Sequence, residues 1–141
     1  MWGGKQLFAF IGGGAAGAAQ VTTTNGTIHT WTIPFRCTPI RAGVTVTVAP
    51  GTAAPVLTFG AAGICGIVVV PTTASANGVY YQDTDYVAAG TGVWTNAIDE
   101  GDQVAVVVSN QSTSTGSVIP WLLVEINPEQ PANNAAMVAT T

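Results

Sequence analysis

The sequence predicts an all-β domain, an antiparallel β-sandwich, on three observations. From about residue 20 onward, apolar and polar residues alternate with a period of two, and helical periodicity is nearly absent. Val, Ile and Thr, which favour strands, dominate these segments. Turn residues interrupt them at intervals of about 8–12 residues, which is typical of a sandwich or a barrel. The length of 141 residues suits one such domain.

The first strands are expected on either side of an Asn-Gly turn. A short strand near residues 20–24 is followed by Asn25-Gly26, a dipeptide that is typical of hairpin turns. The next strand alternates regularly, and one of its faces is expected to point into the core. That face carries His29, Trp31, Ile33 and Phe35.

The middle of the chain predicts three more strands. Residues 41–49 alternate most cleanly. Their expected core face carries Val44, Val46 and Val48. Residues 55–59 predict a short strand, and residues 64–70 form a continuous apolar run. Such a run predicts burial on both faces, by the opposite sheet and by a neighbouring subunit or arm.

The next segment contains a second Asn-Gly turn and an acidic turn. Asn77-Gly78 is expected to lead through a hairpin into a strand at residues 79–87. Acidic residues and a glycine at residues 98–102 predict a turn. This turn is expected to start a Val-rich strand at residues 103–109.

The final strand is expected at residues 117–126, where Pro120 predicts a sheet edge or a bulge. With about eight strands in a single domain, the sandwich is expected to be of the jelly-roll type. Residues 20–126 are expected to form this body. Residues 1–19 predict an extended N-terminal arm, and residues 127–141, which lack periodicity, predict a C-terminal tail or arm.

Charged residues are scarce in this chain. Seven acidic and three basic residues make up 7% of it and give a net charge of −4, whereas an average domain has about 25% charged residues. Three cations release few phosphate counterions, so no nucleic-acid partner is expected. The sequence contains no run of about 18 consecutive apolar residues, so no membrane-spanning helix is expected. Because few charges would have to be desolvated, we expect the surface of this protein to be buried against other proteins. The alternative is a monomer that Thr and Asn side chains keep soluble.

No group of residues predicts catalysis, a metal ion or a cofactor. His29 is the sole histidine, and a core or interface role is expected for it. Asp83 and Asp85 share one strand face and could bind calcium together with the acidic turn, but the spacing of a calcium-binding loop is absent. We therefore predict that the protein is not an enzyme. Cys37 and Cys65 are expected as buried free thiols, with a disulfide as the alternative.

The N-terminal arm and two arginines form the candidate interface. The arm combines apolar anchors with glycines, so it can dock on a neighbour and follow its surface closely. The alternative is an arm folded back on its own sandwich. Two arginines flank a proline-containing bend and can bind carboxylates of a partner. The candidate interface residues are Trp2, Lys5, Leu7, Phe8, Phe10, Ile11, Arg36 and Arg41.

Two segments in the last third of the chain resemble a known family. They are Ile98-Asp-Glu-Gly-Asp-Gln-Val-Ala-Val-Val-Val and Thr115-Gly-Ser-Val-Ile-Pro-Trp-Leu-Leu-Val-Glu125. Both resemble the end of the small jelly-roll decoration (cement) proteins of tailed bacteriophage capsids. The acidic turn before a Val-rich strand is also similar to trimeric jelly rolls of the complement and tumour-necrosis-factor type.

The resemblance implies a structural virion protein on the outer capsid surface. Such a protein forms a homotrimer, binds the major capsid protein and clamps neighbouring capsomers through its arms. Deletion of residues 1–19 is then expected to leave a folded trimer that no longer coats shells. The alternative is a carbohydrate- or receptor-binding module of a virion fibre or surface. Its ligand would bind the acidic residues and the aromatic side chains of Tyr80, Tyr81, Tyr86 and Trp94.

Overall fold

The computed structural model describes residues 6–12, 19–60, 65–83 and 98–126. These residues form nine strands and no helix. The strands are β1 (Leu7–Ile11), β2 (Gln20–Val21), β3 (Gly26–Thr32), β4 (Cys37–Val48), β5 (Val56–Phe59), β6 (Gly66–Val69), β7 (Val79–Asp83), β8 (Gln103–Ser109) and β9 (Ser117–Ile126).

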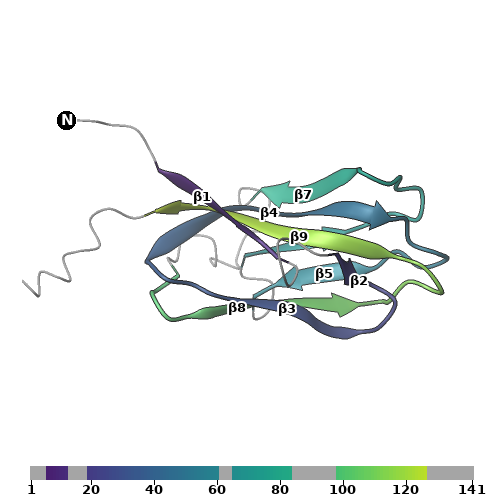
Figure 1. The fold of residues 1–141 in the computed structure, drawn as a ribbon, viewed down its shortest axis with the longest axis horizontal. Coiled ribbons are helices and arrows are strands. Elements are labelled where there is room, and N and C mark those ends of the chain that lie inside the picture. Colours follow the sequence, from purple (N-terminus) through teal and green to yellow (C-terminus); the bar gives the residue numbers. More distant parts are fainter. Residues whose placement is uncertain (1–5, 13–18, 61–64, 84–97, 127–141) are drawn as a thin grey trace, which may run out of the picture.

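The strands form two sheets that lie as two layers (Figure 1). The five-stranded sheet has the order β1-β9-β4-β7, and β2 pairs with β9 beyond the end of β1. The four-stranded sheet has the order β3-β8-β5-β6. All pairings in both sheets are antiparallel. The all-β antiparallel sandwich that the alternation predicts is therefore confirmed.

The core lies between the two sheets and consists mainly of aliphatic and aromatic side chains. Alternate residues of β8 and β9 are buried, and both strands coincide with the predicted ones. Trp31 of β3 and Ile33 just after it are buried, and Phe35 packs against the core from a partly buried position, as predicted. The largest fully buried side chains are Phe59, Ile33, Leu57 and Leu122.

Strand β4 is longer than predicted and contains two irregularities. It begins at Cys37, because the register against β9 shifts between Pro39 and Arg41 and this bulge accommodates the proline. A second shift between Val46 and Val48 turns the last valine outward, where it is 48% exposed. The prediction that Val48 lies in the core is therefore wrong.

Both Asn-Gly turns join strands of different sheets, and the two predicted hairpins are wrong. β2 pairs with β9 whereas β3 pairs with β8, and β6 pairs with β5 whereas β7 pairs with β4. Asn77 has the positive φ (69°) that this turn dipeptide favours. Asn25 is bound to Gln111 instead, since the backbone N–H of each donates to the side-chain oxygen of the other at 2.9 Å.

Strand β6 lies at the edge of the four-stranded sheet and buries one face. Ile67 and Val69 are 45% and 53% exposed, while Val68 and Val70 are buried. The sequence predicts burial of this apolar run on both faces. Burial by the opposite sheet is confirmed, and burial of the outer face by a neighbouring subunit or arm stays a prediction, because no described segment of this chain covers that face.

Pro120 lies in a central strand, β9, and not at the predicted edge. The backbone N–H of Gly12 donates to the Pro120 carbonyl at 2.7 Å, just beyond the end of β1. The reciprocal bond of an antiparallel pair cannot form, because proline has no N–H. Proline is tolerated here because β1 leaves β9 at this residue.

Part of the predicted N-terminal arm belongs to the sandwich. Residues 7–11 form β1 and pair in register with β9, from Leu7 opposite Glu125 to Ile11 opposite Trp121. The predicted boundary between arm and body at residues 19 and 20 is therefore wrong for residues 7–11. This segment fits the alternative expectation, an arm that folds back on its own sandwich. Residues 1–5 and the tail 127–141 lie outside the described residues.

Candidate functional site

The outer face of the five-stranded sheet carries a continuous group of apolar side chains, which we call the apolar face. Alternation along β1 and β9 sends every second side chain away from the core. The neighbouring strands β4 and β7 add outward residues at its border. The apolar face consists of Leu7, Ala9, Ile11, Ile119, Trp121 and Leu123, with Arg41, Gly43, Thr45 and Tyr81 beside them.

The apolar face is open to solvent in the single chain. Leu7 is 54% exposed and Ile11 is 61% exposed, although both are large aliphatic residues. A cavity of about 460 Å³ lies on this face. It is lined by Ala9, Ile11, Arg41, Thr45, Ile119, Trp121 and Leu123. Contiguous exposed apolar surface of this kind is typical of a site that binds another molecule.

Trp121 lies across β4 at the centre of the apolar face. Gly43 is directly opposite it in the register between β4 and β9. A Cβ atom at residue 43 would overlap the six-membered part of the indole ring. The absence of a side chain at Gly43 therefore allows the indole to lie against the sheet.

Tyr81 and Arg41 continue this arrangement toward β7. The Tyr81 ring centroid lies 6.4 Å from that of Trp121, with an interplanar angle of 41°. The guanidinium carbon of Arg41 lies 4.1 Å from the Tyr81 centroid, within the range of a cation–π contact. Apart from the central Trp121 ring and the Tyr81 ring and Arg41 cation at its border, this surface is aliphatic.

The predicted aromatic cluster is divided between the two faces of the sheet. Tyr80 packs against the core, whereas its neighbour Tyr81 is 50% exposed on the apolar face. Tyr86 and Trp94 lie outside the described residues. Trp121 takes their place in the structure. Its position in the alternation, between the inward Pro120 and Leu122, was the sequence signal for an outward aromatic residue.

The predicted interface residues of β1 lie on its two opposite faces. Leu7 and Ile11 belong to the apolar face. Phe10 points the other way and is 9% exposed, and Phe8 beside it is 43% exposed. The Phe8 ring contacts the Phe10 and Phe35 rings, with centroids 4.9 and 5.4 Å away. Trp2 and Lys5, the remaining candidates of the arm, lie outside the described residues.

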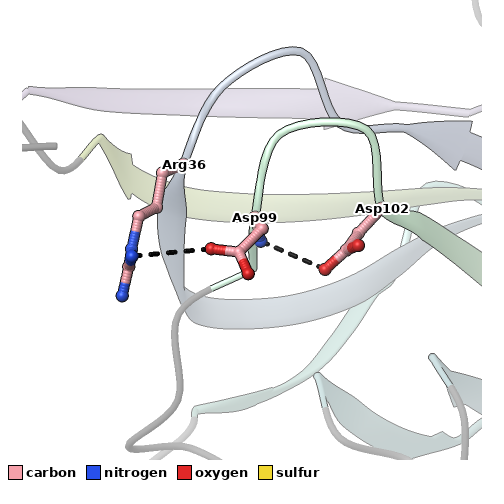
Figure 2. A network of polar contacts seen from close by, with 3 residues as sticks. All are labelled: Arg36, Asp99 and Asp102. Carbon is pink, nitrogen blue, oxygen red and sulfur yellow. Dashed lines mark hydrogen bonds and ion pairs between the residues drawn. The ribbon is translucent and has the colours of Figure 1, made fainter. Parts of the chain in front are cut away.

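The two predicted arginines have different surroundings. Arg41 borders the apolar face. Arg36 forms an exposed ion pair with Asp99 at 3.6 Å, at the turn before β8 (Figure 2). The structure therefore brings Arg41 together with the apolar residues of β1 and leaves Arg36 with an acidic partner of its own chain.

The acidic turn has a structural role. The Asp99 backbone N–H donates to the Asp102 carboxylate at 3.1 Å (Figure 2). Gly101 has a φ of 91°, which favours glycine, and its N–H donates to the Ile33 carbonyl. Asp85 lies outside the described residues. Among the residues that the structure describes, no three His, Cys, Asp or Glu side chains are grouped closely enough to bind a metal ion.

The remaining titratable candidates lie in or near the core. His29 is half-buried, and its ring stands edge-on to Trp31 with centroids 5.3 Å apart. Cys37 and Cys65 are fully buried and are not joined by a disulfide. Burial raises the pKa of Cys37 to about 11. Burial, with a further contribution from Cys37, raises the pKa of Cys65 to about 12, so both thiols are neutral and unreactive near pH 7.

Comparisons with known proteins give no relative. No family model matches the chain, and neither the curated proteins nor the solved structures contain a match. Within the described residues, no helix is long and apolar enough to span a membrane. The chemistry of the apolar face is therefore the basis for assigning a function.

Proposed function

We propose that this chain is a structural protein that decorates and stabilises the capsid shell of a tailed bacteriophage as a homotrimer. The observation that carries this proposal is the apolar face, with Ile11 and Leu7 more than half exposed beside Ile119, Trp121 and Leu123. We infer that this face is covered by other protein chains in the assembly, by copies of itself and by the major capsid protein.

The physical reason is the balance of desolvation. Apolar surface gains about 25 cal/mol for each Å² removed from water. Ten charged residues in the whole chain leave few ions to desolvate when its surface is buried.

The strand pairing supports a jelly-roll type of sandwich, which the decoration proteins that the sequence resembles also have. The pairs β2–β9, β3–β8, β4–β7 and β5–β6 are nested, each inside the previous one along the chain. A long antiparallel ribbon folded over on itself has this pairing, which is the arrangement of a jelly roll. The two segments that carry the resemblance contain all but the last residue of β8 and of β9.

A decoration protein of this kind acts by mass action. Each copy binds the assembled shell more tightly than it binds the separate capsid subunits. Each bound copy therefore lowers the free energy of the assembled shell relative to the opened one. Three linked copies bind with a higher effective affinity than one, so modest contacts at each apolar face are sufficient. In this proposal the apolar face supplies the main contact, and β1 contributes to it as a strand of the body.

The proposal is tested by placing a charge on the apolar face. Ile119 is half-buried in this face, and Ile119→Glu is expected to convert a trimer into a monomer, as measured by sedimentation equilibrium. Thr30→Glu adds the same charge on an exposed residue of the other sheet and is the matched control. A trimer that survives Ile119→Glu, or a wild-type chain without self-association, would contradict the proposal.

A second candidate function, glycan binding, is favoured by the Trp121 and Tyr81 rings. An indole that lies against a sheet, next to a tyrosine and an arginine, offers a surface on which a sugar ring can stack. A glycan array with wild type and Tyr81→Ala tests it. This function would be favoured over the first if the wild-type chain stayed a monomer and bound a glycan, and if Tyr81→Ala removed that binding.

A further inference from the structure

Strand β1 forms an edge of the five-stranded sheet, and no described strand pairs with its outer side. The Gly12 N–H donates to the Pro120 carbonyl, and the Ile126 N–H donates to the Gln6 carbonyl at 2.9 Å. These two bonds determine which residues of β1 bond to β9, because hydrogen-bonded pairs alternate along an antiparallel ladder. The backbone groups of even-numbered residues therefore point to β9. The N–H and C=O groups of Leu7, Ala9 and Ile11 point away from the sheet.

The two edges of the other sheet are protected against strand addition. β3 has a bulge between Thr27 and His29, and β6 has only four residues. Bulges and short length are known to prevent edge pairing. The five residues of β1 are all apolar and contain no proline, charge or bulge.

We propose that β1 pairs with β1 of a second copy of this chain, antiparallel and around a two-fold axis at Ala9. In this register Ala9 is opposite the partner's Ala9 and Leu7 is opposite the partner's Ile11, so the three residues with outward backbone groups on each copy face one another. Three such pairs form about six hydrogen bonds. The small side chain of Ala9 lies at the axis, where two copies approach most closely.

The side chains of β1 fit this pairing on both faces. On the apolar face, Leu7 of each copy would pack beside the partner's Ile11, and these are the two aliphatic residues with high exposure in the single chain. On the other face, the half-exposed Phe8 would lie opposite the partner's Phe10. Cross-strand apolar pairs of this kind stabilise antiparallel sheets.

This inference shares Leu7 and Ile11 with the capsid proposal, but it rests on the outward backbone groups of β1, so the two can fail separately. A contact between five-residue strands is small, so it is expected to be weak in isolation. Where trimers are held next to one another, the same contact would link one trimer to the next with a higher effective affinity.

The test replaces a single outward N–H. Ala9→Pro removes a donor that β9 does not use and places the proline ring on the open edge, where prolines are tolerated. We expect this variant to keep the wild-type unfolding temperature and to lose at least tenfold in the concentration-dependent association measured by sedimentation velocity. Ala9→Ser keeps the N–H and is the matched control: it measures what a change of side chain on the apolar face costs by itself, and the tenfold loss is counted relative to this variant.

A second measurement does not depend on the folding of the proline variant. A nitroxide label on Ala9→Cys reacts selectively, because Cys37 and Cys65 are fully buried. The two residues 9 would have Cα atoms about 5.5 Å apart in the proposed pair, so strong dipolar broadening is expected in the electron paramagnetic resonance spectrum at high protein concentration.

Three results would overturn the inference. One is association of folded Ala9→Pro that equals that of wild type. Another is an electron paramagnetic resonance spectrum of the residue 9 label without dipolar broadening, at protein concentrations where sedimentation shows an increased molar mass. The third is an Ala9 amide that is protected from hydrogen exchange in the monomer, since a segment of the same chain would then cover the edge. Ile119→Glu is expected to leave the broadening intact, which separates this contact from the trimer contact.

Discussion

Gly43 shows how one residue without a side chain shapes the apolar face. It lies opposite Trp121 across two paired strands, and the indole ring occupies the space where a Cβ atom would lie. The outward position of Trp121 follows from alternation in β9, whereas its orientation against the sheet depends on Gly43. These two residues are therefore one structural unit, although 78 positions separate their numbers, 43 and 121.

Gly43→Ala is expected to lift the Trp121 indole from the sheet. The atoms that would overlap belong to the outer part of a side chain at the surface, so the ring can move and the free energy of unfolding is expected to change by less than about 1 kcal/mol. Self-association is expected to weaken several-fold, because the apolar face loses its flat centre. Fluorine NMR of fluorotryptophan-labelled protein measures the change at Trp121.

The control for this substitution is Thr45→Ala. Thr45 lies on the same face opposite Ile119, so its truncation is expected to leave the Trp121 signal in place. A Trp121 signal that Gly43→Ala does not move would show that the indole is not held against the strand at this position.

Cys37 and Cys65 predict a loss of stability at high pH. Both pKa values are raised from 9.0, to about 11 and about 12, so the folded chain keeps its thiol protons where the unfolded chain loses them. The stabilising contribution is complete below pH 9 and is lost as the pH rises from 9 through 11 and 12. Each thiol contributes a slope of at most about 1.4 kcal/mol per pH unit in that window.

Urea unfolding between pH 8 and pH 11 measures this slope. The double variant Cys37→Ala/Cys65→Ala is the comparison, and its free energy of unfolding is expected to fall less steeply above pH 9 than that of wild type. Other groups titrate in the same window in both proteins and cancel in the difference. Equal slopes would mean that the two thiols ionise as easily in the folded chain as in the unfolded one.

At the scale of elements, β1 is part of the body and not a free arm. Phe10 is 9% exposed and contacts the rings of Phe8, Phe35 and Trp31. Deletion of residues 1–19 therefore removes a strand of the five-stranded sheet as well as the segment before it. A truncated chain that fails to coat shells would not identify the contact, and point variants are the better test.

Phe10→Ala is expected to destabilise the isolated chain by about 3 kcal/mol, because it opens a cavity between β1 and β3. Phe8→Ala removes the same ring from a position that is 43% exposed, so its effect is expected to be clearly smaller. Chemical denaturation of both variants at low protein concentration measures the difference. If both effects were small and equal, β1 would not contribute to the stability of the single chain.

Elements were predictable from the sequence where local signals determine them. The strands at 103–109 and 117–126 have the predicted bounds, because clear alternation and turn residues coincide there. Strand pairing was not predictable. Asn25-Gly26 sets the local backbone, but the partner of Asn25 is Gln111, 86 positions away. Local patterns contain no information about such distant contacts, so both hairpin predictions failed.

The candidate site was predictable in part, for a related reason. The exposed Leu7 and Ile11 and the arginine at position 41 were expected at an interface, since apolar anchors and cations on one segment are visible in the sequence. Trp121 and Tyr81 are 40 positions apart and meet through strand β4, which lies between β7 and β9. Their proximity follows from strand order, which alternation does not determine.

At the scale of the whole molecule, few charges and one exposed apolar face point to the same conclusion. Ten charged residues out of 141 give little electrostatic repulsion between copies, with a net charge of −4. The apolar face then has no strong barrier against contact with another neutral surface. We therefore expect a protein that is stable as a single sandwich but associates under ordinary solution conditions.

The molar mass of the intact chain between micromolar and millimolar concentration tests this account most directly. Sedimentation equilibrium of the wild-type protein is expected to give a trimer as the first species that forms as the concentration rises, and its apolar faces are expected to become protected from labelling. A chain that stays monomeric up to millimolar concentration, with Ile11 and Leu7 still accessible to solvent, would contradict it.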